Sequence, residues 1–302
     1  MKKILLILAS FFIATLAQAT WPTRPVTIVI PFPVGGPADT TIRNMQGDLQ
    51  KEFGVPVIVT NIAGANATIA ASHIINERND NHTFLYSDLE FVVGQAYFGK
   101  NMYRSFTPLT TILTTPFIFY ANASSPNLLE RFKAQIQNNS LVNVGYVGAS
   151  VAWTSQISSP LTMNMIPYKG GAPLYTDVLG GHVEYAISGA GGTWQAVYVN
   201  KTFKPIMVSS AERRPGFPDV PTATELGFKG SKVDEWFTFW AFNGVDQEAQ
   251  QTFIAGVRRV VAKSRYIQDL NKTGYRTVNM TQAETQKYIG AEIKRYEGLT
   301  NK

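Results

Sequence analysis

Short turns built of glycine and other small residues follow several β-branched runs of this chain, and these turns are the first places where chemistry can occur. Gly35 and Gly36 follow the run at 26–32, and Gly148 follows the run at 142–147. A helix that starts after such a turn presents unpaired N–H groups, which favour an anion. Glycine also lets a ligand approach the backbone closely. These turns therefore predict a site for a small anion such as a carboxylate.

The candidate ligand-binding residues lie at such turns in both halves of the chain, where ligands bind in open α/β sheets. In the first half they are Phe32, Val34, Gly35, Gly36, Asp39, Asn61, Gly64, Asn66, Ala67 and Ser87. In the second half they are Gly148, Ser150, Ala152, Trp153, Tyr168, Lys169, Gly170, Ser188 and Gly189.

Several of these candidates also have a purely structural interpretation. Asp39 can complement a helix N-terminus and pair with Arg43, four residues later. Ser150 can cap a helix as well as donate to a ligand, and Trp153 can be buried instead of forming a cleft wall. Lys169, beside a glycine pair, can simply be solvated. The sequence leaves these alternatives open.

Catalytic patterns are missing from the sequence. It contains no Gly-x-Ser-x-Gly elbow and no His-Glu-x-x-His motif. Its three histidines, His73, His82 and His182, have no metal-ligand spacing, and there are no cysteines. We therefore expect a binding protein with no enzymatic activity, no metal and no cofactor.

The composition bounds the class of protein. The 302 residues are enough for two domains, and 45% hydrophobic against 16% charged residues is enough to build a sizeable core. The net charge of +6 is scattered, with no basic run interleaved with aromatic residues, so the sequence predicts no nucleic-acid binding. We expect a monomer.

The N-terminus has the pattern of an export signal. Lys2 and Lys3 precede an apolar stretch at 4–16, and Ala17-Gln18-Ala19 is a small-x-small cleavage site. The stretch is shorter than the roughly 20 residues that span a bilayer. We therefore expect a signal peptide at 1–19, cleaved after Ala19, and a periplasmic mature protein.

Strands and helices alternate along the chain, which predicts parallel sheets covered by helices on both faces. We expect strands at 26–32, 55–60, 83–87, 117–121, 142–147, 165–168, 183–188, 205–209 and 236–242. Helices are expected at 40–53, 67–77, 128–137, 152–158, 172–179, 247–264 and 282–297. The last helices need a sheet to cover, so the chain is expected to return to its first lobe. The predicted lobes are 20–120 with 222–302, and an inserted 121–221, joined by strands that cross near Tyr120 and Thr222.

Three motifs resemble one known family. They are Trp-Pro-Thr-Arg-Pro at 21–25 with Pro-Phe-x-x-Gly-Gly-x-x-Asp at 31–39, Ile-Pro-Tyr-Lys-Gly-Gly-Ala-Pro at 166–173 with Leu-Gly-Gly-His-Val-Glu at 179–184, and Pro-Asp-Val-Pro-Thr at 218–222 followed by Trp236. The chain resembles the substrate-binding proteins of tripartite tricarboxylate transporters, the Bug family of periplasmic receptors. The resemblance covers nearly all of the mature chain.

The resemblance implies a two-lobed type II periplasmic-binding-protein fold with the ligand cleft between the lobes. It also implies a small organic carboxylate ligand (a di- or tricarboxylate or an aromatic acid) and membrane transporter subunits as transient partners. A sensor for a signalling kinase, or a receptor for an amide or amino-acid-like solute, is the alternative. The chain departs from the family at 63–67, where Ala-Gly-Ala-Asn-Ala replaces a turn richer in glycine.

Overall fold

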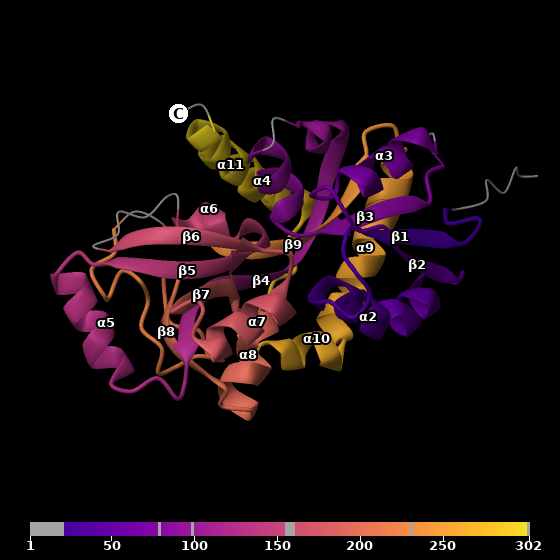
Figure 1. The fold of residues 1–302 in the computed structure, drawn as a ribbon. Helices are drawn as coiled ribbons and strands as arrows, with labels where there is room; N and C mark the ends of the chain where they lie inside the picture. The colour runs from indigo at the N-terminus through magenta and orange to yellow at the C-terminus, as the bar shows by residue number, and fades with distance from the viewer. Residues whose placement is uncertain (1–20, 78–79, 98–99, 155–160, 230–231, 301–302) are drawn as a thin grey trace, which may run out of the picture.

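The computed structural model describes residues 21–77, 80–97, 100–154, 161–229 and 232–300 (Figure 1). The predicted signal peptide at 1–19 and most of the helix expected at 152–158 lie outside these ranges. The described strands form one ten-stranded sheet in the order β2-β1-β3-β9-β4-β7-β5-β6, with β8 and β10 also paired to β4.

The first part of the chain has the predicted βαβαβ order. β1 pairs in parallel with β2 on one side and β3 on the other. A helix then follows β3 directly, where the sequence did not predict one. The elements are β1 (Val26–Ile30), α2 (Pro37–Phe53), β2 (Val57–Asn61), α3 (Thr68–Asn76), β3 (Thr83–Ser87) and α4 (Glu90–Tyr97).

One long strand joins the two halves of the sheet. β4 (Phe106–Asn122) follows the 3-10 turn η1 (Met102–Ser105) and pairs antiparallel with β9 (Asp234–Phe242) as far as Pro116. From Phe117 onward it pairs with β7 and β8 instead. We call the part with β1, β2, β3 and β9 lobe 1, and the part with β5 to β8 lobe 2. The short strand β10 (Arg276–Thr277) pairs with the lobe 1 part of β4.

Strand pairing locates the two crossings between the lobes, and Tyr120 lies on the strand that makes the first one. The first crossing falls between Pro116 and Phe117, because β4 runs through both lobes as one strand. Thr222 bridges to Val208 of β8, so the chain is still in lobe 2 at that point. The return lies between Thr222 and the start of β9 at Asp234.

Lobe 2 is a second α/β unit, in which β5 pairs in parallel with both β6 and β7. The turn η2 and the helices α7 and α8 start at the carboxyl ends of β5, β6 and β7. The elements are α5 (Leu128–Gln137), β5 (Leu141–Val147), η2 (Gly148–Ser150), α6 (Val151–Thr154), β6 (Thr162–Tyr168), α7 (Gly171–Gly180), β7 (Tyr185–Gly189), α8 (Ala190–Trp194), η3 (Gln195–Val199) and β8 (Phe203–Val208).

The C-terminal helices return to lobe 1, as the sequence predicts. Phe253 of α9 (Gln247–Lys263) stacks on Phe53 of α2 and on Phe84 of β3, which fixes α9 against one face of the sheet. α10 (Arg265–Leu270) follows α9. α11 (Gln282–Thr300) packs on β4 and α4 at the other face, where Figure 1 shows α4 and α11 together. Both faces of the sheet are therefore covered, and the strand ends between the lobes remain as the place for a site.

Candidate functional site

The turn after β1 is organised around a buried carboxylate. Asp39 Oδ2 accepts a hydrogen bond from Gly35 N at 2.8 Å, and its Oδ1 accepts one from Arg43 Nε at 2.8 Å. Burial acts to raise the pKa of Asp39, but these donors outweigh it and the pKa is lowered. Asp39 thus makes the predicted pair with Arg43. Its neighbour Val34 is 69% exposed.

Asn61 connects this turn to the next one. Its Oδ1 accepts from Arg43 Nη2 at 2.9 Å, and its Nδ2 donates to the carbonyl oxygen of Phe32 at 3.1 Å. The two predicted ligand turns of lobe 1 are therefore held together by side chains that the sequence analysis named as candidates. Gly35 N, which we expected to face an anion, is already occupied by Asp39.

The turn after β2 has an unusual backbone. Ala65, Asn66 and Ala67 all have positive φ, at 49°, 51° and 64°, in the left-handed region that favours glycine. These are the positions where the chain departs from the glycine-rich family turn. Asn66 packs against Gly94 of α4, where an added Cβ would lie 2.9 Å from Asn66 Cβ. Three adjacent left-handed residues cost on the order of 1 kcal/mol or more each, so the surrounding packing must hold this turn in place.

Ser87 and Thr68 of lobe 1 each have a buried hydroxyl with no hydrogen-bond partner among the described residues. Ser87 ends β3, is 0% exposed, and its Oγ is unpartnered. Thr68 begins α3, and its Oγ1 is also buried and unpartnered. Both lie at the carboxyl side of parallel strands, where a ligand is expected.

Most candidate side chains of lobe 2 bond within the lobe. Ser150 is fully buried, and its Oγ donates to the carbonyl oxygen of Val147 at 2.7 Å. The Tyr168 hydroxyl donates to Asp177 Oδ2 at 2.6 Å, and Ser188 Oγ lies 2.6 Å from Thr193 Oγ1. These hydroxyls position the helix starts, so lobe 2 offers mainly backbone to the space between the lobes.

The remaining lobe 2 candidates divide between core and surface. Trp153 is fully buried in the core, which is the alternative to forming a cleft wall. Lys169 is exposed. Ala152 lies in α6, and Gly170 precedes α7 with extended backbone. Gly148 and Gly189 are the two candidates that the structure places against lobe 1.

Carboxylates of lobe 1 meet these two glycines. An added Cβ on Gly148 would lie 3.2 Å from Glu90 Oε2, and one on Gly189 would lie 2.5 Å from Glu235 Oε2. β5 and β7 are parallel neighbours with Tyr146 opposite Ile187, so Gly148 and Gly189 end adjacent strands in register. A side chain at Gly148, whose φ is 54°, would be strained, and a Cβ at Gly189 would push the Glu235 carboxylate aside.

Asp88 completes this group. Its Oδ1 accepts from Glu90 N at 2.8 Å, directly after β3. Burial, together with the carboxylates of Glu235 and Glu90, raises the pKa of Asp88 well above its ordinary value. Burial raises the pKa of Glu90, and burial with the Glu90 charge raises the pKa of Glu235 to about 8. We call Asp88, Glu90 and Glu235 the acidic cluster.

The sequence analysis did not name Asp88, Glu90 or Glu235 among its candidate residues. Asp88 and Glu90 directly follow a strand end, and that position could have drawn attention to them. Nothing local marked Glu235, because it becomes part of the site only through the pairing of β9 with β3.

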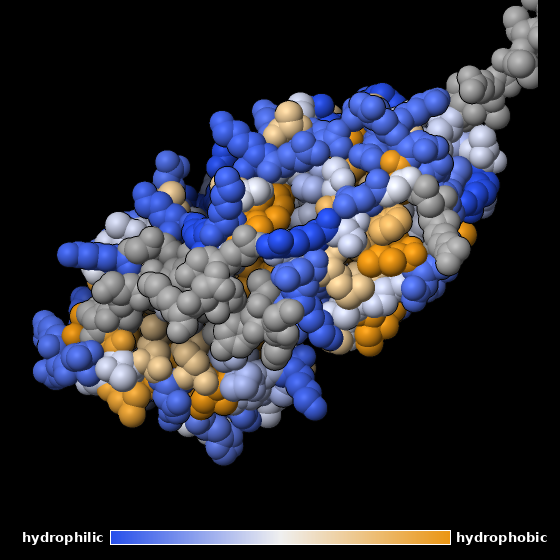
Figure 2. All heavy atoms as spheres, turned by 90° about the horizontal axis from the view of Figure 1, so that it is seen from above, coloured by the Kyte–Doolittle hydropathy of each residue, from blue (hydrophilic) through white to orange (hydrophobic). Residues whose placement is uncertain are grey.

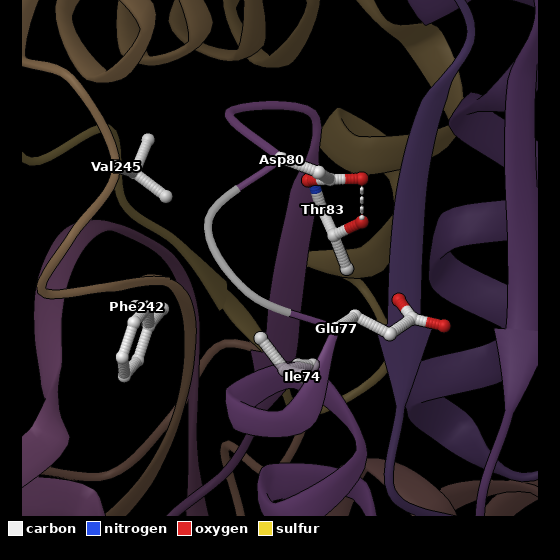
Figure 3. Close-up of a pocket in the computed structure, with 6 residues that line it drawn as sticks. All are labelled: Ile74, Glu77, Asp80, Thr83, Phe242 and Val245. Carbon is white, nitrogen blue, oxygen red and sulfur yellow. Dashed lines mark hydrogen bonds between the residues drawn. The ribbon is translucent and has the colours of Figure 1, made fainter.

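The shallow recess of Figure 3 is not this site. It is lined by Ile74, Glu77, Asp80, Thr83, Phe242 and Val245, and its volume of about 10 Å³ has room for about one water molecule. Thr83 starts β3, so the recess lies at the opposite end of that strand from Ser87. The face shown in Figure 2 has hydrophobic residues in separate small groups among hydrophilic ones. None of the helices in the described part of the chain is long and apolar enough to cross a membrane.

Two α/β lobes that share a long strand and face each other with their strand ends define a periplasmic-binding-protein fold. The sequence profile described as "Tripartite tricarboxylate transporter family receptor" matches residues 41–302. The chain therefore belongs to the tripartite tricarboxylate transporter receptor family, as its motifs predicted, and this is a family of solute-binding receptors, not of enzymes.

The alignments with known relatives cover nearly the whole length of this chain. BugT of Bordetella pertussis is 27% identical, with 98% of this chain and 96% of that one aligned. MatC of Rhodopseudomonas palustris, solved with malate, is 23% identical with a TM-score of 0.78, covering 93% of this chain and 100% of that one. Rpa4515 of the same organism, solved with adipate, is 23% identical with a TM-score of 0.78, covering 93% and 97%. At these identities the two structures establish the fold alone.

Proposed function

We propose that this protein is a periplasmic receptor that captures a small organic carboxylate between its lobes and delivers it to the membrane subunits of a tripartite tricarboxylate-type transporter. Family membership supports the receptor role. The malate and adipate of the two related structures support a carboxylate ligand. The ligand site of the proposal is the boundary between the lobes, where the strand ends meet.

The observation that carries the carboxylate assignment is the Ser87 hydroxyl. It is fully buried at the end of β3 and has no hydrogen-bond partner in the described part of the chain. A buried hydroxyl without a partner costs about 1–3 kcal/mol, which a ligand oxygen can recover. A carboxylate accepts from a hydroxyl more strongly than a neutral oxygen does.

The test is a thermal-shift screen of mono-, di- and tricarboxylates, aromatic acids and amino acids, followed by titration calorimetry. A ligand at 100 times its Kd adds about 2.7 kcal/mol of stability. Ser87→Ala should keep the Tm of the free protein and weaken the ligand about tenfold, since a hydrogen bond to a charged group contributes about 1.5–3 kcal/mol. The exposed Ser124→Ala in lobe 2 is the matched control.

Two outcomes would refute parts of this assignment. If the Ser87 variant bound every acid as tightly as the wild type, the hydroxyl would not be a ligand donor. If no carboxylate raised the Tm of the wild-type protein, the carboxylate class itself would be wrong.

Export belongs to the same proposal. The segment 1–19 is proposed to be a Sec-type signal peptide and the mature protein a monomer. Mass spectrometry of protein recovered from the periplasm should find a chain that begins at Thr20. A chain that retains Met1 would refute cleavage after Ala19.

A further inference from the structure

Both crossings between the lobes are hydrogen-bonded to one residue, Ser209, which directly follows β8. At the first crossing, Ser209 N donates to the carbonyl oxygen of Phe117 at 2.9 Å, and Phe117 N donates to Ser209 Oγ at 2.8 Å. Phe117 is the residue at which β4 exchanges β9 for β7 as its partner. Ser209 is therefore bonded to the first crossing at the point where the pairing changes.

The second crossing is bonded to the same residue. Val233 N donates to the carbonyl oxygen of Ser209 at 3.3 Å, and Ser209 Oγ donates to the carbonyl oxygen of Val233. Val233 directly precedes β9, so it lies where the chain re-enters lobe 1. Ser209 is 1% exposed, and its amide, its carbonyl and its hydroxyl all take part in these four bonds. One buried residue of lobe 2 thus joins the two crossings to each other.

An ion pair holds the next residue of the second crossing to lobe 2. Arg214 Nη2 donates to Asp234 Oδ2, and the Arg214 side chain is only 9% exposed. Arg214 lies in the loop that follows β8, whereas Asp234 is the first residue of β9. The adjacent Arg213 pairs instead with Glu225, which also accepts from Thr222 N, so that exposed pair stays within lobe 2. The Arg214 pair, in contrast, joins one lobe to the other.

The second crossing is also held from lobe 1. Arg295 of α11 donates from Nη1 to the carbonyl oxygen of Lys232 at 3.2 Å, and its Nη2 pairs with Glu292 at 2.6 Å. Three consecutive residues, 232–234, are thus bonded in turn to α11, to Ser209 and to Arg214. The junction between the lobes is therefore short and defined by particular side chains.

A rotation axis through this junction explains why both crossings meet at one residue. When one lobe turns against the other, atoms on the axis stay in place and atoms far from it move. Hinge residues at the ends of elements absorb the change in φ and ψ. Hydrogen bonds that join both crossings persist through such a motion only if the axis passes close to them. If they broke, buried polar groups would lose their partners, which opposes any motion about a distant axis.

We propose that Ser209 is the pivot on which the two lobes turn when the receptor closes on its ligand, and that the Arg214–Asp234 pair keeps the second crossing on this pivot. The inference rests on the proposed receptor function, in which the lobes enclose a carboxylate. Ser209 is then a positioning residue, which acts on the ligand by restricting the lobes to one path of closure. A receptor restricted in this way loses less conformational freedom when it binds.

Distance measurements between the lobes of the free mature protein test the pivot. The chain has no cysteine, so Lys51→Cys in α2 and Lys133→Cys in α5 give one exposed spin label on each lobe for double electron–electron resonance. We expect one narrow distance distribution in this labelled parent and a distribution about twofold broader after Ser209→Ala. Ser210→Ala is the matched control, because its buried hydroxyl donates to the carbonyl oxygen of Glu212 within the same loop.

Asp234→Asn is a second variant, which leaves Ser209 intact. It weakens the buried pair with Arg214 and should also broaden the distribution. Glu225→Gln weakens the pair with Arg213 inside lobe 2 and should leave the distribution unchanged. Circular dichroism and the Tm of each free variant establish that it is folded. If Ser209→Ala does not fold, the comparison of Asp234→Asn with Glu225→Gln decides the question.

Titration calorimetry with L-malate and with adipate adds the ligand. Ser209→Ala should bind whichever acid binds the parent about threefold more weakly or worse, because closure then orders a freer junction, and Ser210→Ala should match the parent. Equal widths in the parent, Ser209→Ala and Asp234→Asn would overturn the pivot and leave the receptor function standing. Unchanged affinity in Ser209→Ala would overturn its role in ligand capture. If neither acid binds but the variants broaden, the pivot stands and the proposed function fails for these acids.

Discussion

Glu235→Gln should stabilise the ligand-free protein at alkaline pH, although it removes a charged residue from the proposed ligand site. The carboxyl group has an ordinary pKa of 4.5 in the unfolded chain, and burial with the Glu90 charge raises the pKa of Glu235 to about 8 in the folded protein. The folded state therefore holds a proton that the unfolded state has lost. The contribution of Glu235 is fully favourable below pH 4.5 and is lost as the pH rises through 8. Because glutamine does not titrate, the variant lacks this loss.

The expected size follows from the same two pKa values. A difference of one in pKa corresponds to about 1.4 kcal/mol, so the loss is on the order of 3–5 kcal/mol between pH 4.5 and pH 9. For a chain of this length, that corresponds to about 5–10 °C in Tm. The Tm of wild type and variant should be close near pH 5 and should separate as the pH rises, with the variant higher.

Thermal unfolding followed by circular dichroism from pH 4.5 to pH 9 measures this difference. Glu130→Gln, on the exposed surface of α5, serves as the control and should follow the wild type at every pH. Subtracting the two curves removes the titration of groups remote from Glu235, and the difference reports Glu235 together with the acids Asp88 and Glu90 that it influences. A constant difference between wild type and Glu235→Gln across this range would refute the argument, because it would mean that Glu235 titrates alike in the folded and unfolded states.

Two further substitutions test the geometry of the site. Gly189→Ala places a Cβ 2.5 Å from Glu235 Oε2, so the ligand affinity measured by calorimetry should fall at least tenfold with little change in secondary structure by circular dichroism; unchanged affinity would show that the lobes need not meet there. Asp39→Asn should cost about 1–3 kcal/mol of unfolding free energy at pH 7 in urea denaturation, because Gly35 N and Arg43 lose a charged partner. The pKa of Asp39 is lowered in the folded state, so its contribution to the free energy of unfolding is present above pH 3.8 and is lost as the pH falls further. The free energy of unfolding of the variant should therefore fall less steeply below pH 3.8 than that of the wild type. The same pH dependence in both proteins would contradict this role of Asp39.

The regular elements were predictable because their periodicity is local. The strand at 83–87 and the helix at 128–137 were predicted with the bounds that the structure shows, since each has a clear apolar face and a turn at both ends. The helix α4 was missed because its sequence, Glu90–Tyr97, is short and its burial comes from packing on α11. This helix is stabilised by its tertiary contacts, which a local sequence pattern does not show.

The long strand β4 was only half predicted for a related reason. Its first part contains Pro108, Thr110 and Thr111, and the expected alternation is interrupted there. The structure shows irregular register with β9 at these residues, which accommodates the proline in the sheet. The lobe boundary was therefore expected at Tyr120, although the pairing changes at Phe117.

The order of the elements could be predicted from the sequence, but the charges near the lobe boundary could not. Gly148 and Gly189 were named because they follow strands, and the structure places both close to carboxylates of lobe 1. The acidic character depends on Glu235, which is 145 residues away from Glu90 and meets it only through the packing of β9 beside β3. No local pattern can indicate such a pair.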